Sequence, residues 1–189
     1  LLGDWDNKHS PLPWYPVKDA DDSTAVRVEY RKTDQSHICV GLPGLARNHP
    51  DRYILDLLNV ILGEGMSSRL FVELREKQGL AYDVHSSITH LRDCGALMIY
   101  CGVQPTNSRR AVMSVLEQLE RMKEEIPEKE INKAKELVKG RLLLGMEDSL
   151  NVAMWTGTQQ LLLGKVQEVE YVFDRLDAVT TYDLRRVAE

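Results

Sequence analysis

Two residues suited to holding a peptide carbonyl, Arg75 and Tyr82, stand seven positions apart in the stretch GEGMSSRLFVELREKQGLAY. A guanidinium and a phenol both donate hydrogen bonds to oxygen, so the pair is equipped to bind a peptide backbone or stabilise an oxyanion. Gly79 is placed to end a helix carrying Arg75, after which Tyr82 begins a strand at the same rim of a sheet. In the structural alternative, Arg75 pairs with Glu73 or Glu76 while Tyr82 packs. Spacing alone favours this structural interpretation.

No metal site is expected within this chain. Neither HExxH nor HxxEH occurs, and no two histidines have the four-residue spacing of a helical ligand pair. His85 and His90 differ by five along an expected strand and therefore point to opposite faces. His37 and Cys39 share a strand face but lack a third ligand. The histidines are His9, His37, His49, His85 and His90.

Nucleophilic and phosphate-binding chemistry also lack a recognisable motif. There is no GxSxG sequence, and Cys94 and Cys101 lie in an apolar segment, where thiols are usually inert. The turn Gly63-Glu64-Gly65 precedes a helix, but it lacks the third glycine of a dinucleotide fingerprint, and its carboxylate would repel phosphate. We interpret it as a turn between two helices.

The composition narrows the function classes. The 189 residues suffice for one sizeable core, and 43% apolar and 28% charged residues are typical of a globular protein. A net charge of −5, with no basic tract, argues against a nucleic-acid surface or another polyanion as partner. No apolar run is long enough to cross a bilayer. Cys39, Cys94 and Cys101, an odd number without close pairing, indicate buried, reduced thiols. We therefore expect a cytoplasmic protein, with a periplasmic one left open because the chain lacks an initiator Met.

The pattern of apolar and polar residues predicts strands first and helices later. Residues 3–22 are rich in Pro and Asp and are expected to be a linker. Strands are expected over residues 25–31, 37–42, 81–91 and 94–103. Helices are expected from Pro50 to about 61, from Ser67 or Ser68 to Gly79, from Pro105 to 122, around 131–142, over 149–163 and 166–177, and after a capping box at Thr180 and Asp183. This order predicts an α+β fold with helices packed on one side of an antiparallel sheet.

The run LNVILGEGMSSRLFVELREKQGLAYDVHSS resembles the non-metal, C-terminal domain of the pitrilysin and mitochondrial-processing-peptidase family of zinc metallopeptidases. The segments GLPGLARNHPDRY before it, and GVQPTNS, INKAKELVKGRLLLGMEDS and LDAVTTYDLRRVA after it, extend the likeness over about residues 20–189. Several motifs in order make the resemblance specific. It implies that residues 1–22 are the end of a preceding domain and a linker. Residues 23–189 are then a substrate-binding domain, truncated at its C-terminus.

The resemblance also implies a divided active site. In the family, one domain holds zinc through HxxEH and a distal Glu, while a metal-free domain contributes an Arg and a Tyr that contact the substrate near the scissile bond. Arg75 and Tyr82 match that pair and its spacing of seven residues. The positions of Ile54–Leu58 that replace the zinc motif are apolar, so zinc is expected only in the absent N-terminal domain. The short GEGM segment departs from the long glycine-rich loop of the non-catalytic mitochondrial subunit and does not support a presequence-receptor role.

The expected function is that of the substrate-binding half of a zinc-dependent metalloendopeptidase that hydrolyses peptides or processes protein segments. By itself, this half is expected to be inactive. Its expected partners are an HxxEH-type domain on the same chain or another subunit, a peptide substrate, and a second subunit in a homo- or heterodimer; neither nucleic acid nor membrane is expected. The alternative is a non-catalytic scaffold subunit of a processing-peptidase-like complex. In a third interpretation, Arg75 and Tyr82 are purely structural.

Overall fold

The computed structural model describes residues 13, 15–18, 26–29 and 33–189. Within these residues, β1 (Ser36–Gly44), β2 (Ala81–His90) and β3 (Gly95–Val103) form one antiparallel sheet in the order β1-β3-β2. The α-helices are α1 (Arg52–Gly63), α2 (Ser108–Arg121), α3 (Glu128–Met146), α4 (Ser149–Leu163), α5 (Val169–Asp177) and α6 (Thr181–Ala188). A π-helix, η1 (Phe71–Lys77), and a short 3₁₀-helix, η2 (Pro105–Asn107), complete the described elements.

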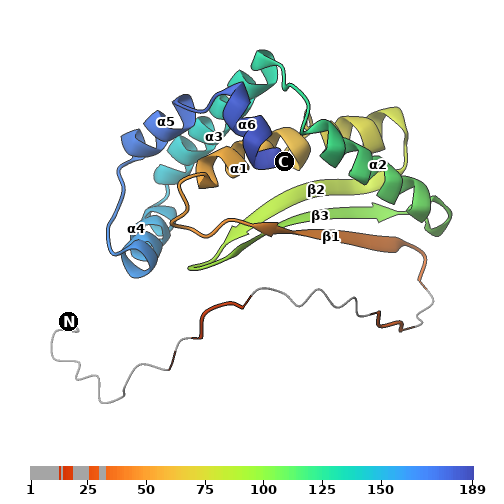
Figure 1. Ribbon diagram of the computed structural model, residues 1–189, viewed down its shortest axis with the longest axis horizontal. Helices are drawn as coiled ribbons and strands as arrows, with labels where there is room; N and C mark the ends of the chain where they lie inside the picture. Colours follow the sequence, from red (N-terminus) through yellow and green to blue (C-terminus); the bar gives the residue numbers. More distant parts are fainter. Residues whose placement is uncertain (1–12, 14, 19–25, 30–32) are drawn as a thin grey trace.

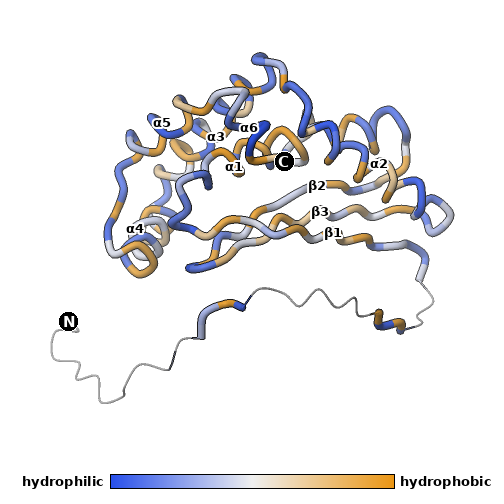
Figure 2. The backbone as a smooth tube through the Cα atoms, viewed as in Figure 1, coloured by the Kyte–Doolittle hydropathy of each residue, from blue (hydrophilic) through white to orange (hydrophobic). Residues whose placement is uncertain are grey.

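The helices lie on one side of the sheet (Figure 1). α1 packs against β2 and also contacts α3, α5 and α6, so it forms the centre of the helical layer. Figure 2 shows α1 as predominantly hydrophobic, which is expected for a helix enclosed between a sheet and other helices. The α+β fold with one-sided helices, predicted from the order of the elements, is confirmed.

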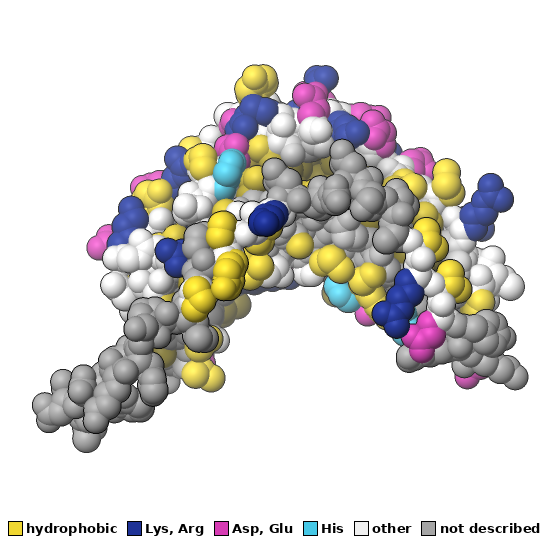
Figure 3. Space-filling view, turned by 60° about the horizontal axis from the view of Figure 1, so that its bottom comes forward, with side chains coloured by type: hydrophobic (Ala, Val, Ile, Leu, Met, Phe, Trp, Pro, Cys, Tyr) yellow, Lys and Arg dark blue, Asp and Glu magenta, His cyan; other side chains and the backbone are white. Residues whose placement is uncertain are grey.

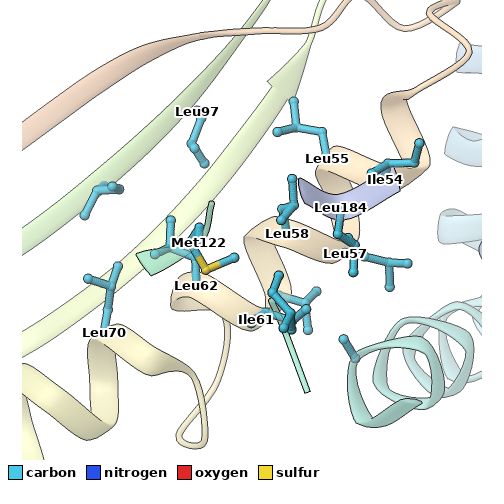
Figure 4. Packing of buried hydrophobic residues seen from close by; sticks show 14 of the residues in the cluster. Ile54, Leu55, Leu57, Leu58, Ile61, Leu62, Leu70, Leu97, Met122 and Leu184 are labelled. Carbon is cyan, nitrogen blue, oxygen red and sulfur yellow. The ribbon is translucent and has the colours of Figure 1, made fainter. Parts of the chain in front are cut away.

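The sequence of α1 explains its central position. Apolar residues cover nearly its whole circumference, and Leu57 has no exposed surface. Ile54 and Leu58 are 7% and 6% exposed and belong, with Leu70 and Leu97, to the buried cluster drawn in Figure 4. Burying one such side chain stabilises a fold by about 1.5–3 kcal/mol. Ile54, Leu55, Leu57 and Leu58 are therefore part of the core in this chain.

Each strand turns one face to the helices and leaves the other open. On β3, Ile99 and Cys101 are almost completely buried, while Met98, which precedes Ile99, is 36% exposed. Burial raises the pKa of the Cys101 thiol, which makes it unreactive. The expectation that all three cysteines are buried is wrong. Cys39 is exposed because it occupies a position of β1 that points to the open face, and Cys94 is partly exposed after β2.

Most predicted element ends are confirmed. α4 spans the predicted residues and ends at Gly164, whose φ of +71° is the left-handed conformation that glycine favours. Thr180 and Asp183 form the predicted capping box at the start of α6. The linker predicted over residues 3–22 is described only at residues 13 and 15–18, which form neither helix nor strand. No helix within the described ranges is long and apolar enough to span a membrane.

The strand predicted over residues 25–31 is wrong where the structure describes it. Residues 26–29 form no strand, and Val26 and Val28 are 82% and 85% exposed. Alternation produces a strand only when a neighbouring strand accepts its hydrogen bonds and a core receives one of its faces. These two valines bury little of their surface, so the pattern alone gives no stabilisation.

The helix predicted to start at Ser67 or Ser68 is wound differently from expectation. It forms a π-helix over Phe71–Lys77. At the end of this helix, the N–H of Gln78 donates to the carbonyl of Glu73, five residues earlier, at 3.1 Å. The periodicity of apolar residues does not separate this winding from an α-helix, because the two differ by a single residue in hydrogen-bond span. π-helical turns are frequent at functional sites.

Candidate functional site

The connection between η1 and β2 places Arg75 and Tyr82 on neighbouring elements. Gly79 has a φ of +59°, a conformation that glycine adopts at little cost, and it ends the helix as predicted. The N–H of Leu80 then donates to the carbonyl of Leu74 at 2.8 Å and closes the turn. The chain reverses within a few residues, so both side chains lie at the end of the sheet where β2 begins and β3 ends.

Tyr82 lies in a β-bulge at the start of β2. Ala81 pairs with Val103 of β3, and Asp83 pairs with Gly102, so Tyr82 is the additional residue. A regular strand would turn one of two consecutive side chains towards the helices. The bulge instead leaves both Tyr82 and Asp83 exposed, and the residue after them is buried again. Bulges of this kind commonly re-aim a side chain beside an active site.

Arg75 is exposed, and within the described part of the chain it forms no ion pair with a carboxylate. Its Cζ lies 5.0 Å from the ring centroid of Phe71, a cation–π distance. Glu73, a partner expected in the structural interpretation, instead accepts hydrogen bonds from Lys77 at 3.1 Å and Gln78 at 3.0 Å. These two hydrogen bonds, that from Gln78 first, lower the pKa of Glu73. The Arg75 guanidinium therefore keeps its donors available for a ligand.

Tyr82 is 58% exposed and so does not serve as a core residue. Its hydroxyl oxygen accepts a hydrogen bond from Nε2 of Gln104 at 3.3 Å. Because the oxygen is the acceptor in this contact, the hydroxyl proton remains free to be donated elsewhere. No hydrogen bond or ring contact between described atoms joins Arg75 to Tyr82. The structure brings the two residues to one end of the sheet without joining them directly.

A group of polar and aromatic side chains, the open-face cluster, lies on the open side of the sheet next to the bulge. Nδ1 of His37 on β1 is 2.7 Å from the Tyr100 hydroxyl on β3, and the ring of His85 on β2 lies 5.1 Å from that of Tyr100. Asp83 Oδ1 is 3.3 Å from Nδ1 of His85. Gly102 lies under the Tyr100 phenol, because a Cβ there would meet the hydroxyl at 3.4 Å. Histidine and hydrophobic side chains border this hollowed side of the molecule (Figure 3).

Sequence reasoning found only part of the open-face cluster. It placed His37 and Cys39 on one strand face, but it had no means of placing Tyr100 between two histidines. That requires the register, in which Cys39 and His85 both stand opposite Tyr100 on either side of β3. The prediction that His85 and His90 point to opposite faces is confirmed, because His90 contacts α1 on the helical side.

Metal-ligating side chains are scattered through the described segments. No three His, Cys, Asp or Glu residues there gather closely enough to hold a metal ion. Within the open-face cluster, His37 and His85 are engaged by Tyr100 and Asp83. That zinc binds elsewhere in the whole protein stays a prediction.

An antiparallel sheet covered by helices on one side is the architecture of a metallopeptidase-like domain. The chain belongs to the family described as "Peptidase M16 inactive domain", which its sequence matches over residues 1–138. The resemblance to the non-metal domain of zinc metallopeptidases is therefore confirmed.

Two curated relatives are uncharacterized zinc proteases. That of Streptomyces coelicolor is 38% identical over 167 residues, which are 87% of this chain and 36% of that protein. YmxG of Bacillus subtilis is 37% identical over 150 residues, which are 79% of this chain and 37% of that protein. The chain thus spans little more than a third of the length of these relatives.

Solved structures show the same fold. A protease from Helicobacter pylori has a TM-score of 0.75 and 28% identity, over 82% of this chain and 38% of that chain. The peptidase M16 inactive domain from Pseudomonas fluorescens has a TM-score of 0.73 and 26% identity, over 82% and 37% of the two chains. The inactive peptidase domain of a Bordetella parapertussis protein has a TM-score of 0.72 and 21% identity, with 84% and 86% covered.

Proposed function

We propose that this chain is the substrate-binding half of a zinc-dependent metalloendopeptidase, and that Arg75 and Tyr82 contact the peptide at the bond to be cleaved. The observation that supports this most directly is the exposure of both side chains at one end of the sheet, Arg75 without an ion pair among the described residues and Tyr82 in a bulge. The relatives named as zinc proteases support the reaction class. The chain itself has no HxxEH, so the proposal assigns zinc to another domain.

The two side chains would act on the scissile carbonyl. When bound in the other domain, zinc supplies an activated water that attacks the peptide carbonyl carbon. As negative charge develops on the carbonyl oxygen, the Arg75 guanidinium and the Tyr82 hydroxyl would donate hydrogen bonds to it. Gln104 supports this role, because its amide N–H occupies the Tyr82 oxygen as acceptor and leaves the phenolic proton for the substrate.

The open-face cluster would contact side chains of the bound peptide. Asp83 connects it to Tyr82, because the bulge exposes the two residues side by side. The rings of His37, Tyr100 and His85 offer a flat surface with polar edges. Such surfaces bind side chains through both stacking and hydrogen bonds.

The test uses the full-length protein with matched controls. Arg75→Ala and Tyr82→Phe should each lower kcat for a peptide by about 10²–10³-fold, the usual effect of removing an oxyanion donor. Bound zinc, measured by atomic absorption, should not change. Arg110→Ala and Tyr182→Phe remove an exposed Arg and an exposed Tyr at other places and should leave turnover unchanged. Wild-type turnover in both site variants would overturn the assignment.

The purely structural interpretation predicts a different result for the same variants. If Tyr82 only supports the fold, Tyr82→Phe lowers the melting temperature and leaves turnover intact. Because the Tyr82 side chain is 58% exposed, we expect Tyr82→Phe to change the free energy of unfolding by less than about 0.5 kcal/mol.

The second candidate function is that of a non-catalytic partner or scaffold subunit. A chain of Candida albicans complex III2 shares the fold, with a TM-score of 0.75 and 20% identity over 82% of this chain. The fold therefore occurs outside isolated proteases and does not by itself fix an activity. An upstream HxxEH with a later Glu in the parent protein, together with peptide hydrolysis, distinguishes the protease from the scaffold.

The exposed surface of α4 supports a further domain as partner. The large apolar side chains of this helix are not confined to the face that packs on the domain, and Leu150, Met154 and Leu161 are 68%, 62% and 85% exposed. Helices of this kind are normally buried. We assign the zinc-bearing domain as the occupant, since the relatives are nearly three times as long as the matched region. Leu161→Glu should weaken association with that domain in gel filtration, and unchanged association would exclude this surface.

A further inference from the structure

A pocket of about 420 Å³ opens between the start of α1 and the connection from α4 to α5. Five of its lining residues are basic or can become so, and none is Asp or Glu: Arg47, His49, Arg52, Lys165 and Arg175. Tyr53 and Tyr171 add aromatic walls with hydroxyl groups. The volume lies within the range of small-molecule sites, roughly 300–1,000 Å³. This concentration of positive charge stands out in a chain whose net charge is −5.

Arg52 lines the pocket, and its hydrogen-bond acceptors among the described residues are all neutral. Its Nη1 donates to the carbonyl of Arg47 at 2.9 Å, and its Nη2 donates to the Tyr53 hydroxyl at 2.5 Å and to Oε1 of Gln167 at 3.3 Å. The Tyr53 hydroxyl in turn donates to Gln167 Oε1 at 3.0 Å. These contacts fix the guanidinium in place, and no carboxylate in the described part of the chain forms an ion pair with it.

The other two arginines are similarly uncompensated. Nε of Arg47 is buried and has no hydrogen-bond partner among the described atoms. Burial, with a smaller contribution from Arg52, lowers the pKa of the Arg47 guanidinium. Arg175 donates through Nη2 to the carbonyl of Pro50 at 3.2 Å, again a neutral acceptor. A buried donor without a partner destabilises the fold, and an anionic ligand that accepts its hydrogen bond would remove this cost.

Two carboxylates that act on the arginines of the pocket, Asp51 and Asp56, are engaged by other groups. Both oxygens of Asp51 bind Arg186 on α6, each at 2.8 Å. Asp56 binds Nε2 of His90 at 3.1 Å. Asp51 and Asp56 still act on Arg175 and Arg47 through space, but neither lines the pocket. The positive charge of the pocket is therefore open to a ligand from solution.

We propose that this pocket binds a phosphate group, carried by inorganic phosphate or by a small phosphomonoester. Several guanidinium forks around one cavity match the many acceptor oxygens of a tetrahedral dianion better than the two oxygens of a carboxylate. The start of α1 at Arg52 adds the partial positive charge of a helix N-terminus. The pocket is too small for an extended polyanion, in agreement with the acidic composition.

This site is separate from Arg75 and Tyr82. The N–H of Arg47 donates to the carbonyl of Leu91, the residue after β2, whereas Tyr82 stands at the beginning of β2. The two sites are thus separated by the length of a ten-residue strand, about 30 Å. Phosphate binding is therefore independent of the proposed peptidase function and can be tested on this chain alone.

Calorimetric titration of the chain with sodium phosphate and with phenyl phosphate, at low and constant ionic strength, tests the proposal. We expect a single site with a Kd of about 1 mM or tighter. Arg47→Gln and Arg175→Gln should each weaken binding about tenfold or more, because each removes a charge-assisted donor. Arg110→Gln removes the same charge from an exposed position on α2 and should leave the affinity within about twofold. Arg52 is left intact because its hydrogen bonds to Tyr53 and Gln167 support the local fold.

Each outcome decides the proposal. Equal affinities for the two ligands identify the phosphate group alone as the recognised feature, and tighter binding of phenyl phosphate identifies an ester that also contacts Tyr171. If neither ligand binds at a concentration of about ten times the expected Kd, the proposal is overturned. An equal loss of affinity in Arg110→Gln also overturns it, because net charge rather than the pocket would then explain binding. Circular dichroism of Arg47→Gln and Arg175→Gln checks that both variants are folded.

Discussion

Gln104, the residue that follows β3, donates a hydrogen bond to the Tyr82 hydroxyl at 3.3 Å and so connects the end of one strand to the bulge of its neighbour. The amide therefore orients the phenol, and it belongs to a segment that sequence reasoning did not assign to the site. A donor this close to the Tyr82 oxygen also restricts the direction in which the phenolic proton can point.

Gln104→Ala should lower kcat/KM of the full-length protein by about tenfold, less than Tyr82→Phe, because the phenol remains but is held less firmly. The double variant should lose little more than Tyr82→Phe alone, since both changes affect the same hydrogen bond to the substrate. Asn132→Ala, which removes an exposed amide from α3, is the control and should have no effect. Full additivity of the two site substitutions would show that Gln104 does not act through Tyr82.

Gly79 and Gly140 should respond in opposite directions to the same substitution. Gly79→Ala should destabilise the chain by about 1–2 kcal/mol, because alanine has a Cβ that opposes the φ of +59°. Gly140→Ala lies inside α3, where no atom within 4 Å would meet the new Cβ, and should stabilise the chain by about 0.5–1 kcal/mol. Urea unfolding followed by circular dichroism measures both. If the two substitutions changed the free energy of unfolding in the same direction, the left-handed turn at residue 79 would not be maintained in solution.

Leu74 tests whether the π-helix η1 is anchored to the core. Leu74→Ala should cost about 2–5 kcal/mol, because the side chain has no exposed surface. Leu161→Ala removes the same atoms from a position that is 85% exposed and should change stability by less than about 0.5 kcal/mol. Thermal unfolding of both variants is the measurement. A small effect at Leu74 would mean that η1 is not packed as the structure shows.

The sequence predicted the fold wherever local chemistry decides the structure. The apolar residues of α1 and the capping box at Thr180 act within one helix, and they are seen as predicted. The alternation at Val26 and Val28 did not yield a strand, because a strand also needs a partner that the local pattern does not specify.

The candidate site could be predicted only in part for the same reason. Arg75 and Tyr82 lie on either side of one turn, so their approach to a common rim followed from Gly79. The bulge at Tyr82 depends on the register with β3, which no spacing along the chain reveals. The basic pocket joins Arg52 to Gln167, 115 positions later, and only the tertiary fold brings them together.

His90 and Asp56 join β2 to α1 and should make the stability of the chain depend on pH. Nε2 of His90 lies 3.1 Å from Asp56, and Nδ1 lies 2.6 Å from the carbonyl of Leu45. The hydrogen bond to Asp56, the largest effect, and that to Leu45 raise the pKa of His90 above its ordinary value of 6.5, against the opposing effect of burial. A raised pKa in the folded state means that the protonated pair contributes its full stability below pH 6.5. This contribution is lost as the pH rises through the higher pKa of the folded state.

The expected result is a difference between two unfolding free energies that shrinks with rising pH. The unfolding free energy of the wild type minus that of His90→Gln, both measured in urea, should be largest near pH 5.5 and smallest near pH 8.5. The pKa values of the Asp51 and Asp183 carboxylates are lowered, so the stability that these groups contribute is lost only below about pH 4. Both groups are also present in both proteins, so they do not affect the difference between about pH 5.5 and pH 8.5. Asp56→Asn should remove most of the pH dependence while keeping a neutral hydrogen-bond partner for His90. A difference that stays constant between the two pH values would show that the pKa of His90 is the same in the folded and the unfolded chain, so that Asp56 does not stabilise the charged imidazole.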